Sequence, residues 1–145
     1  MKKFILTAIA AGFILPNVVN SQCNSYSKRQ CKPSLDPYSS VQISSTLLRP
    51  GDVAEVMLTF YSGQTYRLLV CSQEQLGDVG FKLYDTDKAL IHESEANSDA
   101  KSFDFKVAST QQLILEVEIP MTAQAVSGVA DEGCISVIIG MAQKD

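Results

Sequence analysis

The chain has 145 residues, which suits a single domain, and it contains no tryptophan and only one histidine. Its 16 acidic residues outnumber its 12 basic ones, and its only basic pairs are Lys2-Lys3 and Lys28-Arg29. This composition argues against a nucleic-acid-binding protein, because phosphate backbones are held by clusters of lysine and arginine.

The first 21 residues have the features of a cleavable signal peptide. Lys2-Lys3 provide a positive start, and residues 4–15 form an apolar run. At about a dozen residues this run is too short to span a bilayer, which needs roughly 20, and it has the length of a signal-peptide core. We expect cleavage after Ser21, with Val19 at the −3 position, so that Gln22 becomes the first residue of the mature chain.

The mature chain is expected to be exported without an anchor. Gln22 stands directly before Cys23, where a lipoprotein signal requires a small residue, and no further stretch predicts a transmembrane segment. Without Lys2-Lys3 the chain has ten basic residues against 16 acidic ones, a net charge near −6. The sequence therefore predicts a protein that is secreted, periplasmic or held at the cell surface.

Four cysteines lie in the mature part, Cys23, Cys31, Cys71 and Cys134. An even number in an exported chain favours disulfides, and the absence of a C-x-x-C pair argues against zinc. Four cysteines allow three pairings. We expect Cys23–Cys31, which are close in sequence, and Cys71–Cys134, because the end of one strand lies beside the start of an antiparallel neighbour.

From residue 40 onward, apolar residues recur with a period of two, which is typical of strands with one buried face. Seven or eight short segments at this spacing predict an all-β fold, a single antiparallel β-sandwich of jelly-roll type. Residues 22–39, with two prolines, are expected to form an irregular arm laid over the sandwich of residues 40–145. The segments expected to form strands are residues 41–48, 53–61, 66–70, 79–83, 89–91, 102–107, 113–119 and 134–140.

Several short motifs in the middle of the chain resemble the bacterial pre-peptidase C-terminal domain, a small secreted β-sandwich. They are "SGQTYRLLVC", "VGFKLYDTD" and "FDFKV" followed by "TQQLILEVEIP". The chain departs from that family in having Gln111-Gln112 where a glycine-tyrosine-tyrosine motif is usual, and in its additional cysteines. With "QCNSYSKRQC" after the signal, the layout also resembles small exported proteins of Bacteroidota. These resemblances imply an extracytoplasmic accessory or binding module without its own catalysis.

Asp85 and Asp87, followed by His92, are the candidate metal or catalytic residues. Aspartates two apart resemble the start of a calcium-binding loop. The glycine and the distal glutamate of an EF-hand are missing, however, since Lys88 and Ala89 follow. Asp85 to Lys88 also fill the gap between two expected strands, and aspartate favours such turns. We interpret the segment as a polar turn, with calcium as the alternative, and His92 as a solvated surface residue.

No pattern for catalysis is found in the sequence, and we expect neither a catalytic residue nor a cofactor. There is no G-x-S-x-G motif, His92 is the only histidine that could act as a base, and oxidised cysteines cannot be nucleophiles. Glu116 and Glu118 share one strand face but have no spacing that indicates glycoside hydrolysis. The sequence therefore favours a protein that acts by binding.

Four apolar residues stand in the outward phase of their strands, namely Met57, Leu69, Ile114 and Ile138. They form either a partner-binding patch or a surface covered by the N-terminal arm, and we favour a partner. The expected function is that of a secreted non-catalytic binding module for a protein partner, acting as an accessory subunit in cell-envelope assembly. The alternative is a module that binds carbohydrate or calcium, with the five tyrosines as a platform for a glycan, although the absence of tryptophan argues against it.

Overall fold

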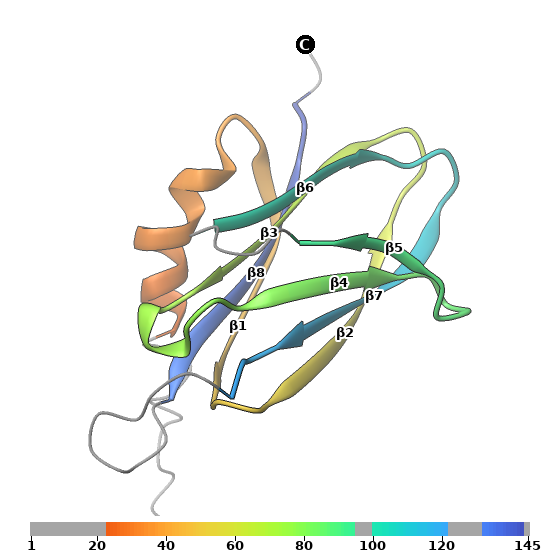
Figure 1. The fold of residues 1–145 in the computed structure, drawn as a ribbon. Coiled ribbons are helices and arrows are strands. Elements are labelled where there is room, and N and C mark those ends of the chain that lie inside the picture. Colours follow the sequence, from red (N-terminus) through yellow and green to blue (C-terminus); the bar gives the residue numbers. More distant parts are fainter. Residues whose placement is uncertain (1–22, 95–99, 122–131, 144–145) are drawn as a thin grey trace, which may run out of the picture.

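The structure, a computed structural model, describes residues 23–94, 100–121 and 132–143. Eight strands form two four-stranded antiparallel sheets that pack face to face (Figure 1). The first sheet has the order β1-β8-β3-β6 and the second has the order β2-β7-β4-β5. The strands are β1 (Ser39–Leu48), β2 (Val53–Phe60), β3 (Thr65–Ser72), β4 (Gly80–Tyr84), β5 (Leu90–Glu93), β6 (Ala100–Lys106), β7 (Gln111–Glu118) and β8 (Gly133–Met141).

The strand order is that of a jelly roll. Each connection along the chain crosses from one sheet to the other, except for the hairpin between β4 and β5. All six strand pairs are antiparallel. The all-β antiparallel sandwich expected from the sequence is therefore confirmed, and β8 lies between β1 and β3 in the first sheet.

The inward rows of most strands fill the space between the sheets, as the period of two predicts. β1 is the exception, because its residues opposite the inward Ile135, Val137 and Ile139 of β8 are the exposed Thr46, Ser44 and Gln42. Leu58, Phe60, Leu68, Phe81, Leu83 and Leu115 are at most 2% exposed. Phe103 and Phe105, which the sequence also places inward, are only partly buried because β6 is an edge strand. They extend the core sideways through ring contacts, with Phe105 at 4.9 Å from Phe60 and 5.1 Å from Phe103 between ring centroids.

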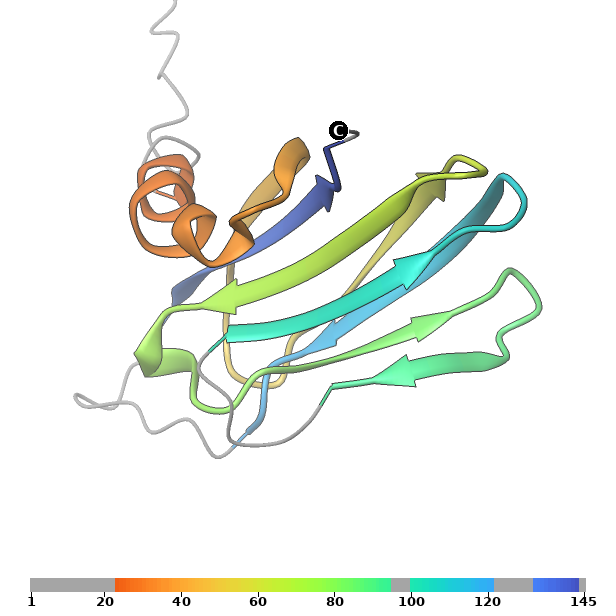
Figure 2. The same cartoon turned by 90° about the horizontal axis from the view of Figure 1, so that it is seen from above.

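The N-terminal arm is helical, not irregular as expected. Residues 23–26 form an α-helical turn, which continues as the π-helical turn η1 (Ser27–Cys31) and the 3₁₀ turn η2 (Lys32–Leu35). The arm lies across the outer face of the first sheet (Figure 2). Its buried side chains recur at every fourth residue, Cys23, Ser27, Cys31 and Leu35, each at most 1% exposed. Residues four apart share one helix face, so this spacing explains why the arm is a helix.

The arm is attached to the sheet by polar as well as apolar contacts. Ser27 Oγ donates to the carbonyl of Cys23 at 2.9 Å and lies within hydrogen-bond reach of the hydroxyls of Ser45 on β1 and Ser136 on β8. Leu35 packs so close to β8 that a Cβ on Gly140 would stand 2.7 Å from its Cδ1. A strand residue without a side chain is required at that position for the arm to dock.

All four cysteines form disulfides, but the expected pairing is wrong. The bonds are Cys23–Cys134 and Cys31–Cys71. β3 and β8 are antiparallel neighbours as assumed, yet their register places Ser136, not Cys134, opposite Cys71. Eight residues of helix separate Cys23 from Cys31 by about 12 Å, which is too far for a bond. Each arm cysteine therefore bonds the strand cysteine beneath it.

We predict that proteolysis without reduction yields the two linked peptide pairs Cys23–Cys134 and Cys31–Cys71 in mass spectrometry. The double variant Cys31→Ser/Cys71→Ser is expected to lose about 2–4 kcal/mol of unfolding free energy, because the unfolded chain regains the conformational entropy that this cross-link removes. Chemical denaturation measures this loss. The matched variant Cys23→Ser/Cys134→Ser should lose at least as much, since its bond closes a longer loop. Recovery of a Cys23–Cys31 peptide would contradict this arrangement.

Candidate binding face

The outer face of the second sheet carries a row of apolar side chains that are neighbours in register. Met57 on β2 pairs with Ile114 on β7, and Ile114 pairs with Tyr84 on β4. Tyr84 pairs with Leu90 on β5, after a register shift between Leu83 and Tyr84 that places Leu90 beside it. Met57 is 55% exposed and Leu90 is 53% exposed, while Ile114 in the middle is 9% exposed. These four side chains, one from each strand, are called the apolar row below. Both ends of the apolar row are open to solvent.

A charged row runs beside the apolar row on the same face. It consists of Glu55, Glu116, Lys82 and Glu93, again paired in register across the four strands. Lys88, in the turn after β4, forms an ion pair with Glu55 at 3.1 Å. A shallow depression of about 250 Å³ lies at the end of this row, lined among others by Lys82, Glu93, Glu116 and Glu118. Glu116 and Glu118 therefore share one face, as their spacing predicts.

The four outward apolar residues picked from the sequence do not form one patch. Leu69 and Ile138 belong to the first sheet, where they are at most 1% exposed and packed beneath Leu35 of the arm. For this pair the expectation of a partner surface is wrong, because the arm covers them. Met57 and Ile114 lie on the second sheet, where both belong to the apolar row. Sequence reasoning missed Tyr84 and Leu90, which only the cross-strand register places beside them.

The Asp85–Lys88 segment is a turn closed by its own aspartate. One carboxylate oxygen of Asp85 accepts the backbone N–H groups of Asp87 and Ala89, each at 2.9 Å. Lys88 adopts a φ of 64°, the left-handed conformation that tight turns require. Within residues 23–94, 100–121 and 132–143, no three His, Cys, Asp or Glu side chains gather as metal ligands would. Calcium binding by Asp85 and Asp87 stays a prediction to be tested.

His92 is packed between strands and is not the solvated surface residue expected. Its ring stacks on Phe103 of the opposite sheet at 3.9 Å between centroids, with an interplanar angle of 9°. The ring of Phe81 on β4 lies 5.7 Å from that of His92 between centroids. His92 pairs with Leu83 in the register of β5 with β4, so its side chain points inward with that of Leu83. The imidazole thus closes the open side of the sandwich.

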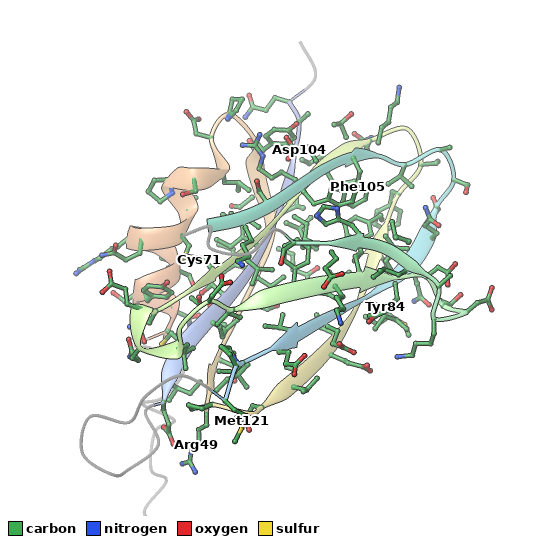
Figure 3. All side chains as sticks on the ribbon, viewed as in Figure 1. Arg49, Cys71, Tyr84, Asp104, Phe105 and Met121 are labelled. Atoms are coloured by element: carbon green, nitrogen blue, oxygen red, sulfur yellow. A yellow bond between two sulfur atoms is a disulfide. The ribbon has the colours of Figure 1, made fainter. Side chains whose placement is uncertain are left out.

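The tyrosines are dispersed and do not make a shared platform for a sugar. Tyr66 is 3% exposed within the core, where its hydroxyl accepts the backbone N–H of Tyr61 at 3.0 Å. Tyr26 and Tyr38 pack against the arm cluster, and burial raises the pKa of Tyr26. Tyr84 alone contributes to the apolar row, near the turn end of β4 and far from Met121 (Figure 3).

A charged cluster fastens the end of the arm to the first sheet. Arg67 on β3 forms a two-point contact with Asp104 on β6, at 2.7 and 2.8 Å. The same guanidinium donates to the carbonyl of Asp36 at 3.2 Å and lies 4.4 Å from the ring centroid of Tyr38. Its hydrogen bonds lower the pKa of Asp104 below the usual value, and the carboxylate in turn raises the pKa of Arg67. This cluster stabilises the arm and leaves the second sheet untouched.

No family model matches the chain, and no curated protein matches it in sequence. Among solved structures, similar folds include the periplasmic inhibitor of g-type lysozyme PliG from Aeromonas hydrophila, at 12% identity, 73% coverage of this chain, 89% of that chain and a TM-score of 0.49. Another is the pre-peptidase C-terminal domain of a Bacillus anthracis collagenase, at 12% identity, 66% and 87% coverage and a TM-score of 0.45. Similarity at this level assigns neither a family nor a function.

Lys101 is a buried charged residue with an ion-pair partner. Lys101 on β6 is 5% exposed and forms an ion pair with Asp78 at 2.6 Å, so this buried charge is compensated. None of the helical segments among the described residues has the length and apolar character needed to cross a membrane.

We predict that Asp104→Asn lowers the free energy of unfolding by about 0.5–1 kcal/mol at pH 7, the usual range for an exposed ion pair. The folded-state pKa of Asp104 is depressed, so its stabilising effect is complete above the unfolded value near 3.9 and is lost as the pH falls through the folded value. Denaturant unfolding at pH 7, 5 and 3 should show the parent and the variant converging only at the lowest pH. A difference that is constant across the series would contradict this role.

We predict that Asp85→Ala costs about 1 kcal/mol, because two backbone N–H groups lose their acceptor. Asp87→Ala is the matched control and should change stability by less than about 0.5 kcal/mol, since no such contact to its carboxylate is found. Neither variant should change the response of the melting temperature to added calcium. A calcium-dependent rise in the parent that both variants abolish would show that the turn is a metal site.

Proposed function

We propose that this protein is an extracytoplasmic, non-catalytic binding module that holds a protein partner on the outer face of its second sheet. The observation that carries the proposal is the asymmetry of the two faces. The arm covers Leu69 and Ile138 on the first sheet, whereas Met57 and Leu90 on the second sheet are more than half exposed. An apolar row that a protein leaves open beside charged residues is typical of an interaction surface.

The composition of this face supports a protein partner. Tyrosine and methionine are enriched in the buried centre of protein interfaces, and charged residues are common at the rim. Tyr84 and Met57 supply the first kind, and Glu55, Glu93 and Glu116 supply the second. An open sheet face with an apolar row across four strands suits another protein surface better than a small ligand, which requires a concave pocket.

The location and the lack of catalysis rest on separate observations. Two disulfides persist in an oxidising compartment, which agrees with export by the signal peptide proposed for residues 1–21. All four cysteines are bonded, so no free thiol is present in the mature chain. The single histidine stacks on Phe103 and is not paired with a nucleophile in any observed contact. A role as an accessory subunit in cell-envelope assembly is the specific form that we propose.

We predict that Met57→Lys reduces recovery of the partner at least tenfold when tagged protein is captured from intact cells and analysed by mass spectrometry. A lysine at this position places a charge within the proposed contact, where desolvation is costly. The melting temperature should stay within the range of surface substitutions, because Met57 is 55% exposed. Leu90→Lys, at the other end of the apolar row, should have the same effect.

The matched control is Met121→Lys, which makes the same chemical change at a residue that is 79% exposed outside the sheet. It should leave recovery unchanged. If all three variants recover as much of the partner as the parent does, this face is excluded as the binding surface. Selective retention on a glycan array, lost in Met57→Lys, would instead favour the carbohydrate-binding alternative.

A further inference from the structure

The edge strand β1 has one side without a neighbour among the described residues. It pairs with β8 over its whole length, and it is the first strand in the order of its sheet. The arm lies on the outer face of this sheet and leaves the rim exposed. Val41 is 53% exposed and Ile43 is 37% exposed, with Gln42, Ser44 and Thr46 also exposed between and beyond them. The outer edge of β1 is therefore accessible to another strand.

The other three edge strands carry the features by which proteins prevent edge pairing, namely charges or short length. β2 contains Glu55, and β6 contains Lys101, Asp104 and Lys106. β5 has only four residues, one of them Glu93. β1 has ten residues without a charge or a proline, and its only irregularity lies between Ser40 and Gln42. Of the four edges, β1 alone is both long and free of charged residues.

We propose that β1 pairs with β1 of a second copy of this chain, antiparallel and related by a two-fold axis, so that two first sheets become one continuous eight-stranded sheet. Such an interface is isologous, and each residue meets its counterpart in reverse order. The chain is acidic, with a formal charge of −4, so most of its surfaces repel a copy of themselves. β1 contains no charged residue, so its pairing with a second β1 places no like charges directly opposite one another in the ladder.

The pleat restricts the register of this pairing. In an antiparallel pair, directly opposite residues point to the same face of the sheet. A two-fold axis perpendicular to the sheet must therefore pass midway between one residue and its own copy. Ile43 shares the outward phase of Ile138, its partner on β8. An axis at Ile43 places the two Ile43 side chains opposite one another, with Val41 opposite Ser45 and Gln42 opposite Ser44. This register covers the exposed isoleucine with an apolar partner.

The test is the oligomeric state of the purified full-length mature chain in sedimentation equilibrium. We expect a concentration-dependent dimer whose dissociation constant rises at least tenfold in Ser44→Lys, because edge lysines oppose strand pairing. Ser102→Lys is the matched control, since Ser102 is likewise exposed on the opposite edge strand β6, and it should leave the dimer unchanged. Melting of each variant confirms that it is folded.

Cysteine trapping tests the register separately. Ile43→Cys should give a disulfide-linked dimer on mild oxidation, because cross-strand neighbours have Cβ atoms about 4.5–5.5 Å apart. Ser102→Cys should stay monomeric on non-reducing gels. A parent chain that is monomeric at every soluble concentration would overturn the proposal, as would a dimer that Ser44→Lys and Ser102→Lys weaken equally.

The outcomes also separate this edge from the binding face. If Ser44→Lys loses a different protein captured from cells while the purified parent stays monomeric, β1 accepts a foreign strand and the second-copy proposal fails. Met57→Lys lies on the other sheet and should dimerise as the parent does. The dimer can therefore fail while the partner face is confirmed, and the reverse also holds.

Discussion

The attachment of the N-terminal arm to the first sheet is the constraint on which the rest of the structure depends. Four side chains spaced four residues apart, Cys23, Ser27, Cys31 and Leu35, are buried against that sheet, and two of them are covalently bonded to it. The arm buries the outward residues of β8 and β3, so β8 is enclosed on both faces. A strand enclosed in this way must be apolar throughout, which accounts for its nearly continuous apolar sequence.

The two faces of the sandwich differ because there is only one arm. A domain of this size has a limited core, and covering one sheet with a disulfide-bonded helix adds a second layer of buried contacts at little cost in chain length. The second sheet receives no such cover from the described residues, and its outward positions hold the apolar row and the charged row. The stabilising layer and the proposed binding face thus lie on opposite sides, so substitutions on one need not affect the other.

Charge is distributed in accordance with this division. The Arg67–Asp104 contact fastens the arm, and the Lys101–Asp78 contact compensates a buried ammonium group at the end of β6. Acidic residues gather on the outer face of the second sheet, where Lys82 and Lys88 balance only part of them. β1 lies at the rim between these regions and has no charge at all. A partner face and a self-pairing edge can therefore coexist on one small domain.

The sequence by itself determined the fold class, the strands and the inward rows of most of them, because burial on one face of a strand requires the period of two that the sequence shows. It also determined the turn at Asp85 and the oxidation of the cysteines. Only the tertiary structure decided the disulfide pairing, since a register that places Ser136 opposite Cys71 is set by contacts distant in sequence. Only the tertiary structure decided the exposure of Leu69 and Met57 as well, since both stand in the outward phase of their strands in the sequence. One lies beneath the arm and the other faces solvent, because alternation specifies which side of a strand a residue occupies but not what covers that side.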